Sequence, residues 1–394
     1  MPILIKIAGY LLAALIVVQL PFFYALYQTH RVARYLGSLP RQQVESPPFV
    51  DVKGTIHVHS AAGGHSTGTY PEIIEAAKEA GYRYLFLTEH RREYTRYHQM
   101  EDPELILIHG FEEPVAPSAT ILTSGNREVT IFSGSSLEGV DTWFDGLEIY
   151  NMHENAVARN TPFHWISFLY HQLLYPDLFY FQLWELNPNR LIEWDRFLET
   201  KMVTGTAGND AHQNIGIVLQ TTSGKSILSL RVDPYLQSFR FVTNHVFLPP
   251  ESEVSREAIL EALKAGSSYI AFENIADPMG FSFHARTEGQ FHPMGARVPR
   301  GSELVFQSPI PVRFLLKRSG ETIEELEGTY FSLNPDQPGA YRVEAYSIDP
   351  PSLLQDKPWI LSTPYFLSEF GHSLTNRWTG LLGKHVKIDQ LMGL

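Results

Sequence analysis

The chain has 394 residues, 44% of them hydrophobic and 19% charged, which is enough for two domains of ordinary size. Its 31 Lys and Arg side chains are outnumbered by 43 Asp and Glu, and the net charge of -12 argues against binding nucleic acid or anionic lipid by charge alone. There is no cysteine, which excludes disulfides, thiol nucleophiles and cysteine-ligated zinc. The 16 histidines remain as the main supply of metal-binding nitrogens.

An uncharged apolar segment extends from Ile7 to Tyr27. At about 1.5 Å per helical residue it spans roughly 31 Å, close to the hydrocarbon thickness of a bilayer. We therefore expect a single-pass anchor over residues 1–30 and a proline-containing linker over 31–52. The alternative is a cleaved signal peptide, but no small-x-small cleavage site follows the apolar segment. The placing of Lys and Arg favours an extracytoplasmic domain only slightly.

Alternating strand and helix patterns follow over residues 53–275. Strands are expected over 55–59, 84–87, 105–108, 147–150 and 202–206, and helices after Pro71, near 190–199 and over 255–266. This alternation predicts an α/β fold with a parallel sheet or βα barrel. In a parallel barrel the active site lies at the carboxyl ends of the strands.

Two segments depart from that pattern. Residues 161–186 are rich in Phe, Tyr and Trp and predict an inserted helical hairpin, either a flap packed over the barrel or a contact with the membrane interface. From 280 to 370 the pattern changes to short alternating runs broken by Gly and Pro, which predicts a β-sandwich-like domain. Residues 371–394 are expected to form a C-terminal tail.

Histidines and carboxylates gather just after the predicted strands. His57 and His59 are two residues apart, so on a strand their side chains would leave the same face and could bind one ion. The ends of the later strands add further ligand types, namely Glu89, His90, Glu112, Asp210 and His212. Mixed imidazole and carboxylate ligation suits Zn, Mn or Fe, and bridging carboxylates can hold two or three such ions.

Four motifs, taken in order, resemble the PHP (polymerase and histidinol phosphatase) family. They are Ile56-His57-Val58-His59-Ser60, Leu87-Thr88-Glu89-His90, Gly110-Phe111-Glu112 and Gly208-Asn209-Asp210-Ala211-His212. Leu147-Glu148-Ile149-Tyr150-Asn151 resembles a further strand end of that family. The resemblance covers about residues 53–215 and implies a distorted βα barrel that hydrolyses phosphoesters with two or three metal ions.

The resemblance also implies a ligand set. His57, His59, Glu112 and Asp210 would hold a first ion, Glu112 would bridge to a second, and His90 with His212 would serve the others. The sequence departs from the family at several points: Glu89 stands where Asp is usual, an aspartate expected after the first motif is missing, and two expected histidines are absent. His65 could replace the aspartate, while His153, His109 and His164 could compensate for the histidines. One or two ions are therefore expected rather than three.

These observations predict a metal-dependent phosphoesterase that acts on a small phosphorylated substrate. Glu89 or His212 could transfer the proton, and Arg91 and Arg92 could bind phosphate oxygens. One alternative is a catalytically degenerate barrel that keeps metal for structure or ligand binding. Another is a metal-dependent amide or lactone hydrolase, although no Lys lies at a matching strand end.

Overall fold

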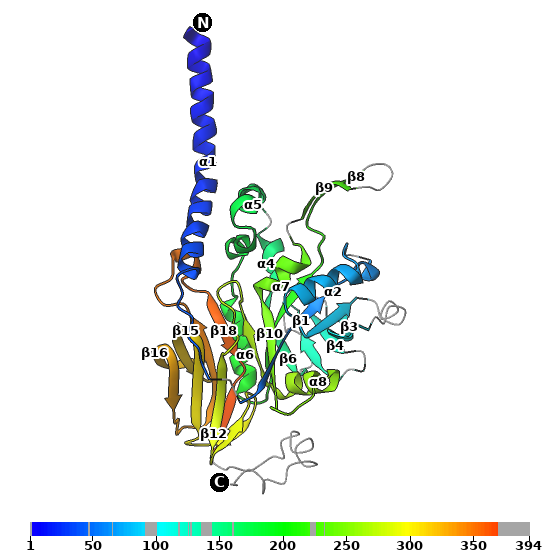
Figure 1. The fold of residues 1–394 in the computed structure, drawn as a ribbon, viewed down its shortest axis with the longest axis vertical. Coiled ribbons are helices and arrows are strands. Elements are labelled where there is room, and N and C mark those ends of the chain that lie inside the picture. Colours follow the sequence, from blue (N-terminus) through cyan, green and yellow to red (C-terminus); the bar gives the residue numbers. More distant parts are fainter. Residues whose placement is uncertain are drawn as a thin grey trace.

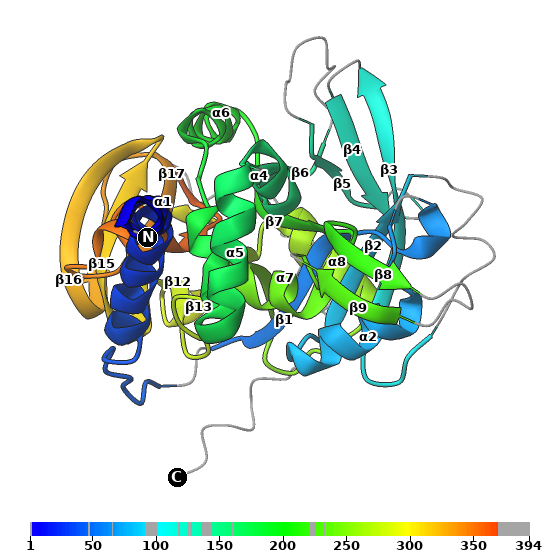
Figure 2. The same ribbon diagram turned by 90° about the horizontal axis from the view of Figure 1, so that it is seen from above.

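The structure is a computed structural model, and it shows a body of helices and strands from which one long helix projects (Figure 1). It describes residues 2–45, 48–64, 66–90, 101–116, 119–124, 126, 128–134, 144–159, 161–220, 226–231 and 233–368. Viewed along the long helix, an antiparallel sheet lies on one side of the body and the strands that bear the site lie on the other (Figure 2).

The first seven strands close into a barrel. They are β1 (Val50–Val58), β2 (Tyr84–Glu89), β3 (Ile106–Ala116), β4 (Ala119–Ser124), β5 (Thr130–Phe132), β6 (Gly146–Asn151) and β7 (Thr204–Ala211). β1 pairs in parallel with β2 and β7, β2 with β3, and β6 with both β5 and β7. β4 is antiparallel to both its neighbours. The carboxyl ends of β1, β2, β6 and β7 therefore meet at one end of the barrel.

The barrel is not the regular strand-and-helix alternation that the sequence predicted. α2 (Tyr70–Glu79) does separate β1 from β2, and α4 (Met152–Ala158), α5 (Pro162–Leu174), η2 (Pro176–Gln182) and α6 (Pro188–Leu198) separate β6 from β7. Between β3 and β5, however, the described chain forms hairpins. Only two residues join β3 to β4, and a connection that short permits an antiparallel turn but no crossover helix.

The barrel sheet continues into the C-terminal region. β10 (Thr243–Leu248) pairs with the first half of β1, β11 (Ser268–Ala271) pairs with β10, and β18 (Pro358–Ser362) pairs with β11, all antiparallel. The remaining elements are η1 (Ala61–Gly63), β8 (Gly216–Gln220), β9 (Ser226–Arg231), α7 (Tyr235–Phe241), α8 (Arg256–Ala265), β12 (Ser282–Thr287), β13 (Gln290–His292), β14 (Arg297–Pro299), β15 (Glu303–Arg318), β16 (Glu321–Leu333), β17 (Gly339–Tyr346), η3 (Ser352–Leu354) and β19 (Tyr365–Ser368). Residues after 280 thus form strands, as predicted, and they are hydrogen-bonded to the barrel through β11.

The N-terminal helix α1 (Pro2–Leu36) is long and apolar enough to cross a membrane, by length and composition. Its 35 residues correspond to roughly 52 Å. It continues past the predicted anchor, and β1 begins at Val50, so the connection between them is shorter than the expected linker over 31–52.

The second half of α1 is packed into the body. Four side chains at helical spacing are buried on one face of the helix: Phe22, Ala25, Thr29 and Val32. The Phe22 ring stacks on Phe163 of α5 at 5.2 Å, and the Thr29 hydroxyl lies 2.9 Å from Nε2 of His171. Because this half shares a core with α5 and η2, the projecting half is held in a fixed direction relative to the body.

A buried ion-pair network joins β1 to the C-terminal strands. Nδ1 of His245 on β10 lies 2.8 Å from Oδ1 of Asp51, and its Nε2 lies 3.2 Å from Oε1 of Glu273. Tyr269 stacks on the imidazole and donates to Asp51. Burial alone would lower the pKa of His245, but the two carboxylates raise it to about 9.

We expect the His245→Gln variant to be less stable than the parent by about 3 kcal/mol, because Asp51 would remain buried without its cation and Glu273 would keep only Lys53. In the folded protein the pKa of His245 is about 9, above its ordinary value of 6.5. The contribution of charged His245 to the free energy of unfolding is therefore complete below pH 6.5 and is lost as the pH rises through 9. Urea unfolding at pH 6 and at pH 9.5 checks this. Equal differences between parent and variant at the two pH values would contradict it.

Candidate metal centre

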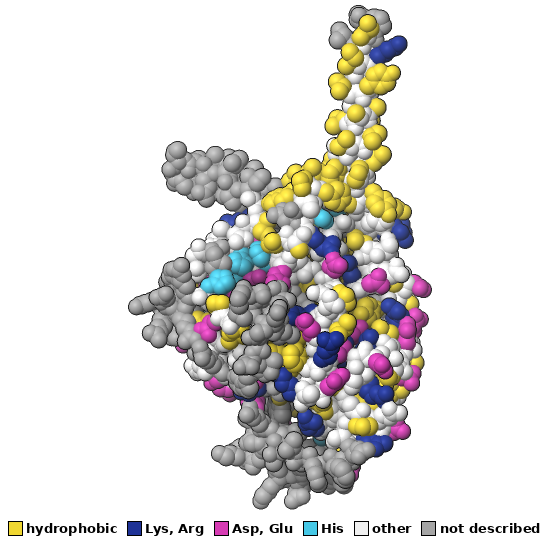
Figure 3. Space-filling view, turned by 180° about the vertical axis from the view of Figure 1, so that it is seen from behind, with side chains coloured by type: hydrophobic (Ala, Val, Ile, Leu, Met, Phe, Trp, Pro, Cys, Tyr) yellow, Lys and Arg dark blue, Asp and Glu magenta, His cyan; other side chains and the backbone are white. Residues whose placement is uncertain are grey.

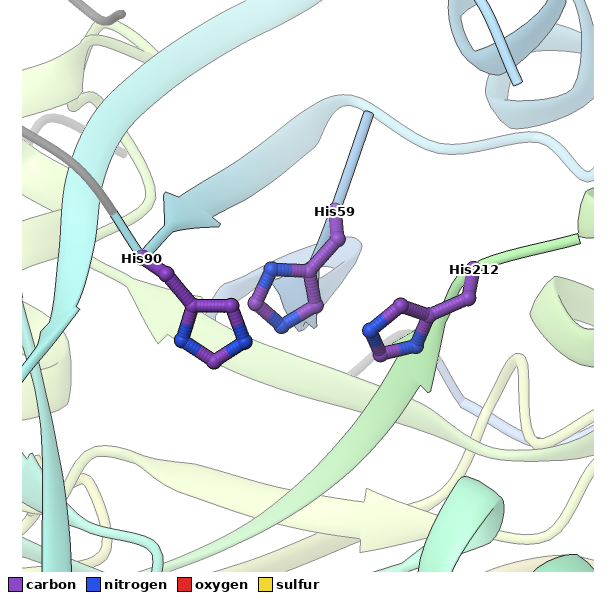
Figure 4. A group of neighbouring side chains, drawn as sticks. All are labelled: His59, His90 and His212. Carbon is purple, nitrogen blue, oxygen red and sulfur yellow. The ribbon is translucent and has the colours of Figure 1, made fainter. Parts of the chain in front are cut away.

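The carboxyl ends of β1, β2 and β7 bring three histidines together. Figure 4 shows His59 after β1, His90 after β2 and His212 after β7 with their rings turned toward one another. The His59 ring stacks on His212 at 4.5 Å and on His90 at 4.8 Å between centroids. The predicted convergence of these strand ends is therefore present.

The backbone at the site is irregular in a way that the sequence pattern did not predict. His57 has φ 67° and Asp210 has φ 47°, in the left-handed region that non-glycine residues seldom adopt. The pairing of β1 with β2 and β7 shifts register around His57, and β1 ends at Val58, before His59. The two histidines thus reach one site through a bulge rather than through simple strand alternation.

Four ligand atoms converge at the centre of this end of the barrel. Nε2 of His57 lies 3.3 Å from Oε2 of Glu112 and 3.3 Å from Oδ1 of Asp210. Nε2 of His59 lies 3.4 Å and 3.2 Å from the same two oxygens. His57, His59 and Glu112 form one of the groups whose ligand atoms all lie within 4.8 Å of one another.

These separations fit a bound ion better than a set of direct hydrogen bonds. Charge-assisted N–H···O bonds are usually about 2.7–2.9 Å long, shorter than all four separations. Ligands held at about 2.0–2.1 Å in a tetrahedral site are roughly 3.3–3.4 Å apart. The spacing of His57, His59 and Glu112 and the chemistry of the donors therefore fit a divalent transition-metal ion, and Asp210 lies beside both histidines as a further ligand.

A buried carboxylate orients one of these ligands. Oε2 of Glu148 on β6 lies 2.9 Å from Nδ1 of His57, and its Oε1 accepts a hydrogen bond of 2.9 Å from the Asn151 amide. Asn151 also donates to Oδ2 of Asp210 at 3.2 Å. A proton on Nδ1 of His57 leaves Nε2 as the ligand atom, which is the usual arrangement of a carboxylate behind a metal-binding histidine.

The electrostatics of the site favour a cation. Burial alone would lower the pKa of His57, but Asp210, Glu148 and Glu112 together raise it well above 6.5. The pKa of Asp210 is well below its usual value despite its burial, because His57 and His59 lie beside it. Three buried carboxylates around two imidazoles thus require positive charge, which a divalent ion would supply in place of a proton.

Gly208 makes room for Glu148. A Cβ atom at position 208 would lie 2.0 Å from Oε2 of Glu148, the oxygen that faces His57. We expect Gly208→Ala to displace this carboxylate and to lower metal affinity about 10- to 100-fold, the usual effect of losing such a supporting residue. Isothermal titration with Zn²⁺ or Mn²⁺ measures this, with Gly9→Ala as the control because no atom lies within 4 Å of that Cβ position. Parent-like affinity in Gly208→Ala would contradict the role given to Glu148.

His59, His90 and His212 form a second group with ligand atoms within 4.8 Å of one another. Nδ1 of His212 lies 2.6 Å from the backbone oxygen of Asp210, so this nitrogen bears the proton and Nε2 is the ligand atom. Oε2 of Glu112 lies 3.3 Å from Nδ1 of His90, which places this carboxylate next to both groups. The geometry therefore allows Glu112 to bridge two ions. His59 belongs to both groups, however, so it can complete only one of them at a time.

The other residues singled out from the sequence lie in different places. Glu89 is fully buried and its Oε1 accepts from the Ser60 amide at 3.0 Å, next to His59. His153 on α4 lies 4.6 Å from the His212 ring, close to the site. His109 lies three residues before Glu112 on β3, which places it on the opposite face of that strand. His164 is on α5 and pairs with Thr161, while His65, Arg91 and Arg92 lie outside the described residues.

Three supporting residues had no assigned role in the sequence interpretation. Glu148 and Asn151 were noticed only as a family-like strand end, yet they hold His57 and Asp210 in place. Tyr235 on α7 donates to the backbone oxygen of His59 at 2.7 Å and fixes the turn after β1. Strand pairing between β6 and β7 could have linked Glu148 to the site, whereas no signal in the sequence marked Tyr235.

No family model matches the chain, and no curated protein matches it. Among solved structures, it is similar to a two-domain protein from Bacteroides vulgatus containing a predicted PHP-like metal-dependent phosphoesterase. The two share 14% sequence identity and a TM-score of 0.35, over 84% of this chain and 99% of that chain. Similarity this low does not bear on the fold or the chemistry of the present chain, so the site is interpreted from its own geometry.

Proposed function

We propose that the protein is a metal-dependent phosphoesterase. The observation that supports this most directly is the set of four ligand atoms of His57, His59, Glu112 and Asp210, spaced as around one divalent ion. The order of the four motifs, which resembles the PHP family, favours phosphoesters over other substrates of metal hydrolases. One or two ions of Zn, Mn or Fe suit the mixed donors.

A bound divalent ion would supply Lewis-acid activation of water and of a phosphoryl oxygen. In the hydrolysis, an oxygen–phosphorus bond forms from water, the bond from phosphorus to the ester oxygen breaks, and the leaving oxygen takes up a proton as the alcohol departs. Burial lowers the pKa of His212, and when only the ion between His57, His59, Glu112 and Asp210 is bound, Nε2 of His212 is free to accept the proton of water.

The remaining residues hold the metal ligands in place or bind the substrate. Glu148 keeps His57 in the tautomer that offers Nε2, and Glu89 holds the turn at Ser60 beside His59. Glu89 thus acts as a positioning residue in this proposal, because its carboxylate is buried. Arg91 and Arg92, which follow His90 in the sequence, would bind phosphate oxygens.

We further propose that α1 is an uncleaved single-pass anchor and that the body lies outside the cytoplasm. Buried Phe22, Ala25, Thr29 and Val32 support the first part, since cleavage after the apolar segment would remove part of the core. Mass spectrometry of the mature protein tests it. A new amino terminus between residues 25 and 50 would contradict the anchor.

A phosphoester panel tests the proposed activity. Full-length protein, purified in detergent and loaded with Mn²⁺ or Zn²⁺, should cleave at least one phosphomonoester or phosphodiester, and chelation should abolish the cleavage. If metal-loaded protein cleaves none, while an anion such as phosphate binds and raises its melting temperature, a catalytically degenerate metal-binding module explains the site instead.

A further inference from the structure

An apolar cavity adjoins the metal centre. One narrow cavity is lined by Asp210, His153 and neighbouring residues of α4, β7 and α7. A second, also narrow, lies between α4, α5 and η2 and is lined mostly by apolar and aromatic side chains, among them Trp165 and Phe168. Both are lined by Ala156 and Ile215, so the apolar cavity begins where the site cavity ends.

Helix α5, which forms one wall of the apolar cavity, is also apolar on its outer face. Its inner face buries Ser167, Phe168 and His171. On the outer face Ile166 is 40% exposed, Leu169 49%, Leu173 81% and Leu174 60%. A helix in water normally presents polar side chains on such a face. The exposed leucines therefore indicate contact with an apolar environment.

The position of α5 along α1 identifies that environment. The Tyr170 hydroxyl donates to the Gln19 side chain, and the Tyr170 ring contacts Phe22 and Phe23. Gln19 to Phe23 belong to the uncharged segment that would cross the bilayer, so α5 lies at the level where that segment meets the body. Apolar side chains continue from α1 onto this end of the body, and histidines lie on the same face just below (Figure 3).

The metal centre opens at this same end. α4 and α5 follow the carboxyl end of β6, and β8 and β9 follow that of β7. All four lie toward the end from which α1 projects (Figure 1). Since α1 is packed against α5 and η2, the site is held facing the membrane surface, whichever side of the membrane the body occupies.

We infer that the substrate is a phosphate ester of a bilayer lipid, an inference that rests on the proposed phosphoesterase function and on α1 as the anchor. The phosphate lies at the metal centre, and the hydrocarbon chains stay in the bilayer beside the exposed apolar face of α5. Water attacks phosphorus, the bond to the lipid oxygen breaks, and the lipid alcohol leaves with a proton and returns to the bilayer.

The first test measures contact between the protein and lipid chains independently of catalysis. Metal-free full-length protein is reconstituted into phosphatidylcholine vesicles with brominated acyl chains, and the fluorescence of Trp165 is taken as the difference between the parent and Trp165→Phe. Bromine should quench this signal, because Trp165 is a partly buried side chain of α5, the helix that the inference places against the acyl chains. An unquenched Trp165 signal would overturn the inference.

The second test compares substrates and variants. Mn²⁺-loaded protein should cleave phosphatidic acid or phosphatidylglycerol in vesicles at least tenfold faster than glycerol 3-phosphate at the same bulk concentration. In the double variant Leu169→Glu, Leu173→Glu, this ratio should fall at least tenfold. Ile192→Glu is the matched control, since Ile192 is 50% exposed on α6, which lies farther from the projecting end of α1 than α5 does (Figure 1), and it should keep the parent ratio.

The outcomes of the second test distinguish failure of the lipid-substrate inference from failure of the proposed phosphoesterase function. If no ester of either kind is cleaved, the phosphoesterase function fails and the lipid substrate fails with it. If soluble esters are cleaved as fast as lipid esters, and the α5 variant keeps the parent ratio, the phosphoesterase function stands and only the lipid inference is overturned.

Discussion

Changing Asp210 to Asn is expected to lower phosphoester hydrolysis at least about 100-fold. Oδ1 of Asp210 lies 3.3 Å from Nε2 of His57 and 3.2 Å from Nε2 of His59, so the change keeps the size of the side chain but removes the charge of a metal ligand. Loss of such a ligand should exceed the 10- to 100-fold effects seen for supporting residues. Initial rates at several metal concentrations measure this loss of activity, and excess metal should restore part of the rate.

Asp102→Asn is the matched control for that measurement. Asp102 forms a surface ion pair with Lys78 near the start of β3, away from the carboxyl ends of the strands, and should leave the rate unchanged. A parent-like rate for Asp210→Asn at limiting metal would show that Asp210 is not a ligand.

Removal of residues 1–36 is expected to destabilise the body severely, whereas removal of residues 1–18 should not. The shorter deletion takes away the exposed part of α1, while the longer one also removes the buried face that includes Phe22, Thr29 and Val32. Each large apolar side chain that loses its burial costs about 1.5–3 kcal/mol. The longer deletion would also expose Phe163 and His171 of α5.

Thermal unfolding and soluble yield in detergent compare the two deletions. The longer one should melt at a clearly lower temperature or aggregate. Equal melting temperatures would mean that α1 does not belong to the core of the body, and would weaken the inference that the site is held facing the membrane.

Local sequence patterns predicted several elements of the fold well. The helix after Pro71 is α2, the helix near 190–199 is α6, and the helix over 255–266 is α8 with a Ser255 cap. The antiparallel course of β3, β4 and β5 was missed, because it depends on a two-residue connection and on pairing between distant strands rather than on local periodicity. The pairing of β10 with β1 is likewise a long-range feature that no window of sequence contains.

The candidate site was predictable in its ligand types but not in its supporting structure. The spacing of His57, His59 and Asp210 marked strand ends, and the structure brings them together with Glu112. The left-handed backbone at His57 leaves no trace in composition or periodicity, since nothing local distinguishes a bulge from a regular strand. The packing of α5 on α1 joins residues that are far apart in the sequence, so no local pattern predicts it. This packing favours the interpretation of the aromatic segment as a contact with the membrane interface over that of a flap on the barrel.

The central claim is that His57, His59, Glu112 and Asp210 hold a metal ion. Elemental analysis of the full-length protein, after loading with Zn²⁺ or Mn²⁺ and removal of excess metal, tests it most directly when the parent is compared with the His57→Ala, His59→Ala double variant. We expect at least one tightly bound ion per chain in the parent and its loss in the variant, with both proteins folded by circular dichroism. Equal metal content in the two proteins would contradict the assignment.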